Sequence, residues 1–198
     1  MTPSALQIIR TEHQALAAVL DALRRTVDDI RDRGVPPDFE ALRALLFYID
    51  AYPERLHHPK ETEHLFRRLR ARSSESTAVL DRLEREHALG EQAIRALEHQ
   101  LLEFEMLGPS RLGPFAGALG QFCDRYLEHM WTEEREIFPL AQKCLTDDDW
   151  AQIGQAFAAN RDPLTGHSPD ADFEALFHRI VRLLPPPLGI GPEPGTRA

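Results

Sequence analysis

Apolar residues recur at intervals of three and four along most of the chain, which is the spacing of one face of an α-helix. No stretch alternates apolar and polar residues over the length of a strand. Short segments rich in glycine, proline or serine interrupt the helical pattern. The pattern therefore predicts an all-α protein with four long helices: residues 4–33, 38–72, 77–107, and a fourth that begins near 114 and continues past Leu140 to the end of the bundle at 145.

The segments between these helices are short. They are Gly34-Val35-Pro36-Pro37, the serine-rich residues 73–76, and Leu107-Gly108-Pro109. Because long helices joined by short turns fold back on one another, we expect an antiparallel up-down four-helix bundle. Pro53 and Pro59 fall inside the second helix. Each lacks a backbone N–H, so a kink or short break is expected there.

Two further helical stretches follow the bundle. Thr146 is a candidate N-cap for the first of them, and residues 173–184 again show helical spacing of apolar side chains. We interpret residues 1–145 as the bundle, 146–184 as a C-terminal helical extension packed on it, and 185–198 as a Pro/Gly-rich tail without regular structure. A second interpretation of the last amphipathic helix is a homodimer contact.

The chain has 198 residues and a formal net charge of -9. Proteins that bind nucleic acids concentrate Lys and Arg on one face, so this excess of acid argues against a nucleic-acid partner. No apolar run reaches the roughly 18 residues that a membrane-spanning helix needs. The first residues also lack the basic and apolar regions of a signal peptide. We therefore expect no membrane partner and a cytoplasmic location.

Both cysteines, Cys123 and Cys144, fall on the last helix of the predicted bundle. The helical rise places them about 30 Å apart, which is too far for a disulfide. Two thiolates cannot complete a zinc site by themselves. Any metal bound here is therefore held by nitrogen and oxygen ligands.

Histidine and glutamate recur four residues apart, a spacing that presents both side chains on one helix face. Composition alone gives about 1.5 such pairs, and helical charge pairing adds to that number. The sequence has four of them: His57/Glu61, His87/Glu91, His99/Glu103 and His129/Glu133.

The positions of four histidines relative to the turns are more selective. In antiparallel neighbours, two residues lie at the same height when they are equally distant from the connecting turn. The midpoint between His13 and His57 is residue 35, that between His57 and His87 is 72, and that between His87 and His129 is 108. Residues 35 and 108 fall in predicted turns, and residue 72 lies at the Arg72-Ser73 boundary where the next turn begins. We expect these histidines to form one layer across the bundle, with Glu61 and Glu133 one helical turn away.

The layer is predicted to face the core, because His13 is in phase with Ile9 and Leu16. Buried carboxylates and imidazoles are costly without compensating partners. Two divalent cations would provide them, with imidazoles as terminal ligands and each glutamate bridging both ions. Ligation by histidine and glutamate suits iron or manganese, and zinc is a possible substitute.

Several motifs resemble those of the hemerythrin-like (HHE cation-binding) proteins. They are T-E-H at 11–13, H-H-P-K-E at 57–61, E-R-E-H at 84–87, H-M-W-T-E-E-R-E-I-F-P at 129–139, and LTDDDWAQIGQAFAANRDP after the bundle. The resemblance covers residues 4–163 and implies a four-helix bundle around two iron ions, bridged by carboxylates, that binds a small diatomic ligand or handles iron. Matching by motif, the resemblance implies the metal ligands His13, His57, Glu61, His87, His129 and Glu133.

The sequence departs from oxygen-carrying hemerythrins in one respect. Those proteins have two histidines four residues apart on the third helix, whereas Leu83 precedes His87 here and Glu91 follows it. Either Glu91 is a seventh ligand or one coordination position stays open. Glu134 is an alternative to Glu133. We expect His58, which is rotated by about 100° from His57 on an α-helix, to face solvent or to support the ligands from outside.

Three functional hypotheses follow. The first is a non-haem di-iron protein that binds dioxygen or nitric oxide for sensing, scavenging or carriage. The second is a di-iron oxidase or peroxide-reactive protein, or an iron donor for the repair of iron centres. The third is a metal-free helical interaction module acting through residues 170–184. The first two share one site, and the sequence does not separate them.

Overall fold

The computed structural model describes residues 4–168, 173–186 and 188–190, and every regular element among them is helical. The bundle elements are α1 (Ala5–Arg33), α2 (Phe39–Ile49), η1 (Asp50–His57), α3 (His58–Lys60), η2 (Glu61–Phe66), α4 (Arg67–Arg72), α5 (Thr77–Leu107), η3 (Pro109–Arg111), α6 (Leu112–Thr132), η4 (Glu133–Ile137) and α7 (Phe138–Cys144). The elements that follow are α8 (Asp147–Phe157), η5 (Pro163–Thr165) and α9 (Glu174–Leu183). The predicted all-α class is confirmed.

Local signals in the sequence set the ends of the helices. At the start of α1, the hydroxyl of Ser4 accepts the backbone N–H of Gln7, and the Gln7 side chain accepts the Ser4 N–H. The helix ends at Gly34, whose φ of 67° is the left-handed conformation that glycine adopts without a Cβ clash. Thr146 caps α8 in the same reciprocal way with Asp149, as its position predicts.

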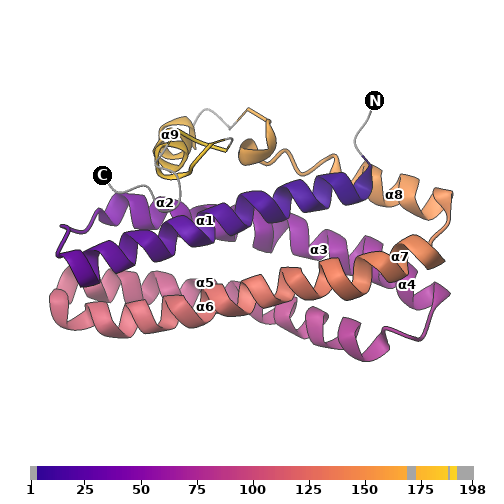
Figure 1. Ribbon diagram of the computed structural model, residues 1–198, viewed down its shortest axis with the longest axis horizontal. Coiled ribbons are helices and arrows are strands. Elements are labelled where there is room, and N and C mark those ends of the chain that lie inside the picture. Colours follow the sequence, from indigo (N-terminus) through magenta and orange to yellow (C-terminus); the bar gives the residue numbers. More distant parts are fainter. Residues whose placement is uncertain (1–3, 169–172, 187, 191–198) are drawn as a thin grey trace.

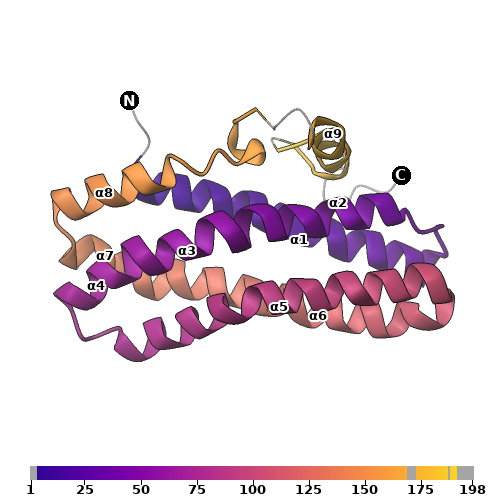
Figure 2. The same cartoon turned by 180° about the vertical axis from the view of Figure 1, so that it is seen from behind.

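Four helical segments lie side by side in Figures 1 and 2: α1, the segment from α2 to α4, α5, and the segment from α6 to α7. Two apolar clusters fill the space between them. One includes Leu20, Leu45 and Phe115. The other includes Ile9 and Phe66. The predicted histidine layer lies between these clusters along α1, because His13 follows Ile9 and precedes Leu20.

The second and fourth segments are continuous but not uniformly α-helical. Residues of η1, η2 and η4 form π-helical turns, in which N–H groups reach carbonyls five residues back. The N–H of His58, for example, donates to the carbonyl of Pro53. The kink or break expected near Pro53 and Pro59 is thus a π-helical stretch. A wider turn accommodates the missing proline N–H groups without ending the helix.

The C-terminal extension packs on the bundle among the described residues. Helix α8 contacts α1, and α9 contacts α2. The apolar face of α9 contributes the buried Ile180, with Leu184 just beyond its end, to the same core as α1 and α2. Figure 1 shows α9 lying across α2. The homodimer contact through α9 stays a prediction. Of the predicted tail, residues 187 and 191–198 lie outside the described residues.

Cys123 is buried, Cys144 is partly buried, and both are free thiols, as expected from their separation on one helical segment. In the part of the chain that the structure describes, no helix is both long and apolar enough to cross a membrane.

Candidate metal centre

Five imidazoles and two carboxylates from all four helical segments converge between the two apolar clusters. They belong to His13 (α1), His57 (η1), His58 (α3), Glu61 (η2), His87 (α5), His129 (α6) and Glu133 (η4). The two carboxylate side chains are fully buried, and the imidazoles are no more than 7% exposed. The structure therefore brings together all six residues that the sequence selected, and adds His58.

Glu61 lies at the centre of this group. Its Oε1 is 3.3 Å from His57 Nε2 and 3.8 Å from His13 Nε2, and its Oε2 is 3.6 Å from His87 Nε2. Two sets of candidate ligand atoms lie within 4.8 Å of one another: His13, His57 and Glu61 form one, and His58, Glu61, His87 and His129 form the other. Glu61 belongs to both, which is the position of a carboxylate that bridges two metal ions.

Glu133 belongs to neither of these sets, but its two carboxylate oxygens lie near histidines of both. Its Oε2 is 3.4 Å from His13 Nε2, whereas its Oε1 is 3.2 Å from His129 Nε2 and 3.7 Å from His87 Nε2. One oxygen thus faces each set. Glu134, at a spacing of five from His129, lies outside, where its Oε1 contacts His13 Nδ1 at 3.0 Å and its side chain is 40% exposed.

The outer nitrogen of every one of these imidazoles has an oxygen partner from the protein. The Nδ1 contacts are Glu134 at 3.0 Å for His13, Glu12 at 2.6 Å for His57, Glu54 at 3.3 Å for His58, Thr62 at 2.8 Å for His87, and Glu86 at 2.7 Å for His129. A metal-binding histidine is typically oriented in this way, with one ring nitrogen held by a carboxylate or hydroxyl and the other directed at the metal.

Six of the inward atoms lack a hydrogen-bond partner. Among the described residues, His13 Nε2, His57 Nε2 and both oxygens of Glu61 and Glu133 are buried without a hydrogen bond. The Nε2 atoms of His87 and His129 face each other at 2.9 Å. Six buried polar atoms in one place would be a large cost if nothing bound there, because each forfeits its interaction with water. The donor set is nitrogen and oxygen only, which fits iron or manganese and permits zinc.

The same contacts determine the pKa values of three of these histidines. Burial opposes the charge on His129, but Glu133 and Glu86 outweigh it and raise its pKa to about 10. Burial likewise opposes protonation of His57, while Glu61 and Glu12 bring its pKa well above the usual 6.5. His58 differs, because burial and the neighbouring His87 lower its pKa to about 3.

The expectation that His58 faces solvent was wrong. His58 is 5% exposed, and its ring stacks on that of His87 with centroids 4.3 Å apart. The expectation assumed an α-helical rotation of about 100° per residue. His58 instead directly follows the π-helical η1. A π-helix has more residues per turn than an α-helix, so the side chains after it point in different directions from those that α-helical geometry predicts. The sequence signal was the pair of prolines that flank H-H.

Glu91 and His99 of α5 lie outside the centre. Glu91 is on the helix surface and pairs with Arg95 at 3.0 Å, so it takes no part in the centre. The seventh residue that converges there is His58. His99 is 74% exposed and 3.7 Å from Glu103, an ordinary pair on a helix surface.

A family model for the hemerythrin HHE cation binding domain matches residues 4–141 of the chain. The chain belongs to this family. No significant match was found among curated proteins or among solved structures. The matched segment contains every residue of the hemerythrin-like centre described above, and it ends before α8 begins at Asp147. Membership in the family and the His/Glu cluster together indicate that the chain binds metal cations.

Proposed function

We propose that this hemerythrin-like protein holds two iron ions and binds a small diatomic molecule, dioxygen or nitric oxide, for sensing, scavenging or carriage. The ligands in this proposal are the seven converging residues, with Glu61 and Glu133 as bridges. Its main support is that six inward atoms of this group, on His13, His57, Glu61 and Glu133, are buried and lack hydrogen-bond partners. Bound iron would supply a redox-active position at which a diatomic molecule can coordinate.

The number of ions is inferred from the ligand sets. Two sets of atoms, each compact enough to hold one ion, share Glu61 and have Glu133 between them. We also propose that the four helical segments form an antiparallel up-down bundle. It is supported by the short connections at residues 34–38, 73–76 and 108–111 between segments that lie side by side (Figure 2). Manganese or zinc would fit the same donors.

The protein's own residues hold the ligands in place and keep bulk water away. Glu12, Glu54, Glu86 and Glu134 fix the rings through Nδ1, so that the opposite nitrogens point inward. The apolar clusters on both sides of the layer reduce the local dielectric constant, which strengthens the binding of cations by the two bridging carboxylates.

Metal content and the absorption spectrum test this proposal. We expect about two irons per chain after anaerobic reconstitution with ferrous iron, and an absorption band that changes on exposure to air or to nitric oxide. His57→Ala should lose iron, whereas His99→Ala is the matched control, because His99 is a surface histidine with the same i,i+4 glutamate. Failure of the wild-type protein to take up iron would refute the proposal. Turnover of peroxide, or release of iron to an acceptor, would instead favour the oxidase or iron-donor function.

A further inference from the structure

The segment that follows α8 lies against the outer side of His57. Phe157, the last residue of α8, packs edge-on against the His57 ring, with ring centroids 5.6 Å apart. The side chain of Asn160 then reaches Glu12, the carboxylate that contacts His57 Nδ1. The family match ends at residue 141 and does not include this segment. A part of the chain outside the matched domain thus contacts the support of a candidate metal ligand.

The contact between Asn160 and Glu12 uses both carboxylate oxygens. Asn160 Nδ2 donates to Glu12 Oε1 at 2.8 Å and to Glu12 Oε2 at 2.9 Å. Glu12 Oε2 is also 2.6 Å from His57 Nδ1. Glu12 is 7% exposed and Asn160 is 5% exposed. A carboxylate buried to this extent is costly unless donors contact it, and Asn160 provides two of its hydrogen bonds.

A second contact sets the orientation of the Asn160 amide. The ammonium group of Lys60 donates to Asn160 Oδ1. An ammonium has only donors, so the amide oxygen faces Lys60 and the amide NH2 group faces Glu12. An aspartate of the same shape would place an oxygen against the Glu12 carboxylate instead. The two neighbours of this side chain therefore require an amide between them.

The backbone around Asn160 is anchored separately. The Tyr48 hydroxyl donates to Asp162 Oδ2 at 2.7 Å. Arg161, between Asn160 and Asp162, has a φ of 52°, a left-handed conformation that residues other than glycine rarely adopt. A residue stays in such a conformation only where its surroundings hold it. The loop therefore presents Asn160 in a fixed position.

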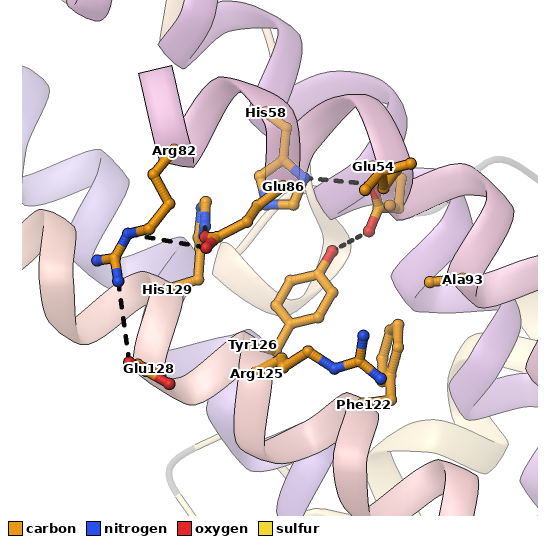
Figure 3. A pocket seen from close by; sticks show the side chains of 12 residues that line it. Glu54, His58, Arg82, Glu86, Ala93, Phe122, Arg125, Tyr126, Glu128 and His129 are labelled. Atoms are coloured by element: carbon orange, nitrogen blue, oxygen red, sulfur yellow. Dashed lines mark hydrogen bonds and ion pairs between the residues drawn. The ribbon is translucent and has the colours of Figure 1, made fainter. Parts of the chain in front are cut away.

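Little room for water remains beside this contact. The cavity at the outer side of His57 measures only about 10 Å³, which is at the lower limit for one water molecule. The outer sides of His58 and His129 differ, because they lie beside a cavity of about 210 Å³ (Figure 3). Glu86, which contacts His129 there, is 43% exposed. Water can supply hydrogen bonds to Glu86, whereas Asn160 must supply them on the His57 side.

From these contacts we propose that Asn160 is a positioning residue of the metal centre, which acts on His57 through Glu12. Held by the Asn160 amide, Glu12 accepts a hydrogen bond from His57 Nδ1–H, which leaves Nε2 free to bind an ion. That Nε2 atom is buried without a hydrogen-bond partner and lies 3.3 Å from Glu61 Oε1. The inference rests on the metal-binding part of the proposed function and is independent of the diatomic ligand.

The first experiment is a double-mutant cycle. Ferrous-iron affinity is measured anaerobically against a competing chelator in wild type, Asn160→Leu, Glu12→Leu and the double variant. Leucine matches the branching of asparagine and cannot form hydrogen bonds. Each single change should lower the affinity by about tenfold or more. When residue 12 is already leucine, Asn160→Leu should lower it by less than about twofold. Losses that multiply in the double variant would overturn the proposal.

The second experiment separates positioning from packing. Asn160→Asp keeps the shape of the side chain but replaces its NH2 group with an oxygen, so its iron affinity should fall by about tenfold or more. Tyr48→Phe is the control, because it loosens the same loop at Asp162 and leaves the hydrogen bonds to Glu12 intact. Its melting temperature should fall, while its iron affinity should stay within about twofold of wild type. Equal losses of affinity in the two variants would overturn the proposal, because the loop would then act by its packing alone.

A third measurement follows His57 itself in protein loaded with zinc, a diamagnetic ion that the same donors accept. The proton on His57 Nδ1 should give a slowly exchanging NMR signal, because it is buried and hydrogen-bonded to Glu12. Loss of the signal in Glu12→Leu assigns it. The signal should exchange faster in Asn160→Leu and stay unchanged in Tyr48→Phe. An unchanged signal in Asn160→Leu would overturn the proposal.

The outcomes separate this inference from the proposed function. If wild type binds two irons and the Asn160 variants bind them as tightly, the positioning role is wrong while the proposed function stands. If wild type binds neither iron nor zinc, both fail. If wild type binds zinc but not iron, the proposed function fails, and the zinc affinities of the same variants decide the positioning role.

Discussion

Asp162 should make the protein less stable as the pH rises through the weakly acidic range. Its side chain is 4% exposed. Burial raises its pKa from 3.8 to about 6, and the nearby Glu12 adds to this effect, although Tyr48 and the backbone N–H of Leu164 donate hydrogen bonds that act in the opposite direction. The folded protein therefore holds this proton more tightly than the unfolded chain does.

The sign and size of the effect follow from linkage. A raised pKa contributes stability that is fully present below pH 3.8 and is lost as the pH rises through about 6. The shift of roughly 2 units corresponds to about 3 kcal/mol, of which about 2 kcal/mol falls between pH 4.5 and 7.5. In a chain of this size, about 2 kcal/mol corresponds to a change of roughly 4–8 °C in melting temperature.

The assay compares urea unfolding of metal-free wild type and Asp162→Asn at several pH values. Asparagine cannot ionise and keeps one oxygen, which can accept one of the two hydrogen bonds that Tyr48 and the Leu164 N–H donate to Asp162; the loss of the other does not depend on pH. The free energy of unfolding of the wild type minus that of Asp162→Asn should fall by about 2 kcal/mol from pH 4.5 to 7.5. Titrating groups that do not interact with Asp162 cancel in this difference. A difference that is constant, or that grows with pH, would refute the reasoning.

Two further predictions concern the supports of the centre. Gly90→Ala should destabilise the fold by about 1–3 kcal/mol, because the new methyl group displaces Glu54. Gly117→Ala is the control: nothing lies within 4 Å of the added Cβ, so this change should stabilise the fold by about 0.5–1 kcal/mol. Equal shifts in the melting temperature of the two variants would contradict this prediction. Asn160→Ala removes both hydrogen bonds to Glu12, the carboxylate that orients His57. The affinity for iron, measured against a competing chelator, should then fall by about 10–100-fold. An unchanged affinity would show that Asn160 does not support the centre.

The residues of the centre divide into those that sequence reasoning could find and those that it could not. His13, His57, His87 and His129 were found because each lies on a different helix at equal distances from short turns. Such distances are a property of the chain itself. The partners of the rings could not be found in this way. Which carboxylate reaches the Nδ1 atom of a given histidine depends on how each helix is rotated about its axis, and only the packing between helices sets that rotation.

The sequence by itself determined the helical class, the ends of the helices and the height of the ligand layer, because caps, turns and apolar periodicity act over a few residues. Only the tertiary structure decided that His58 points inward, since this depends on π-helical winding around Pro53 that the packed bundle tolerates. The tertiary structure also placed Asn160, 148 residues from Glu12 along the chain, over one side of the centre. A contact at such a distance leaves no periodic signal in the sequence, because it is formed when α8 packs on α1.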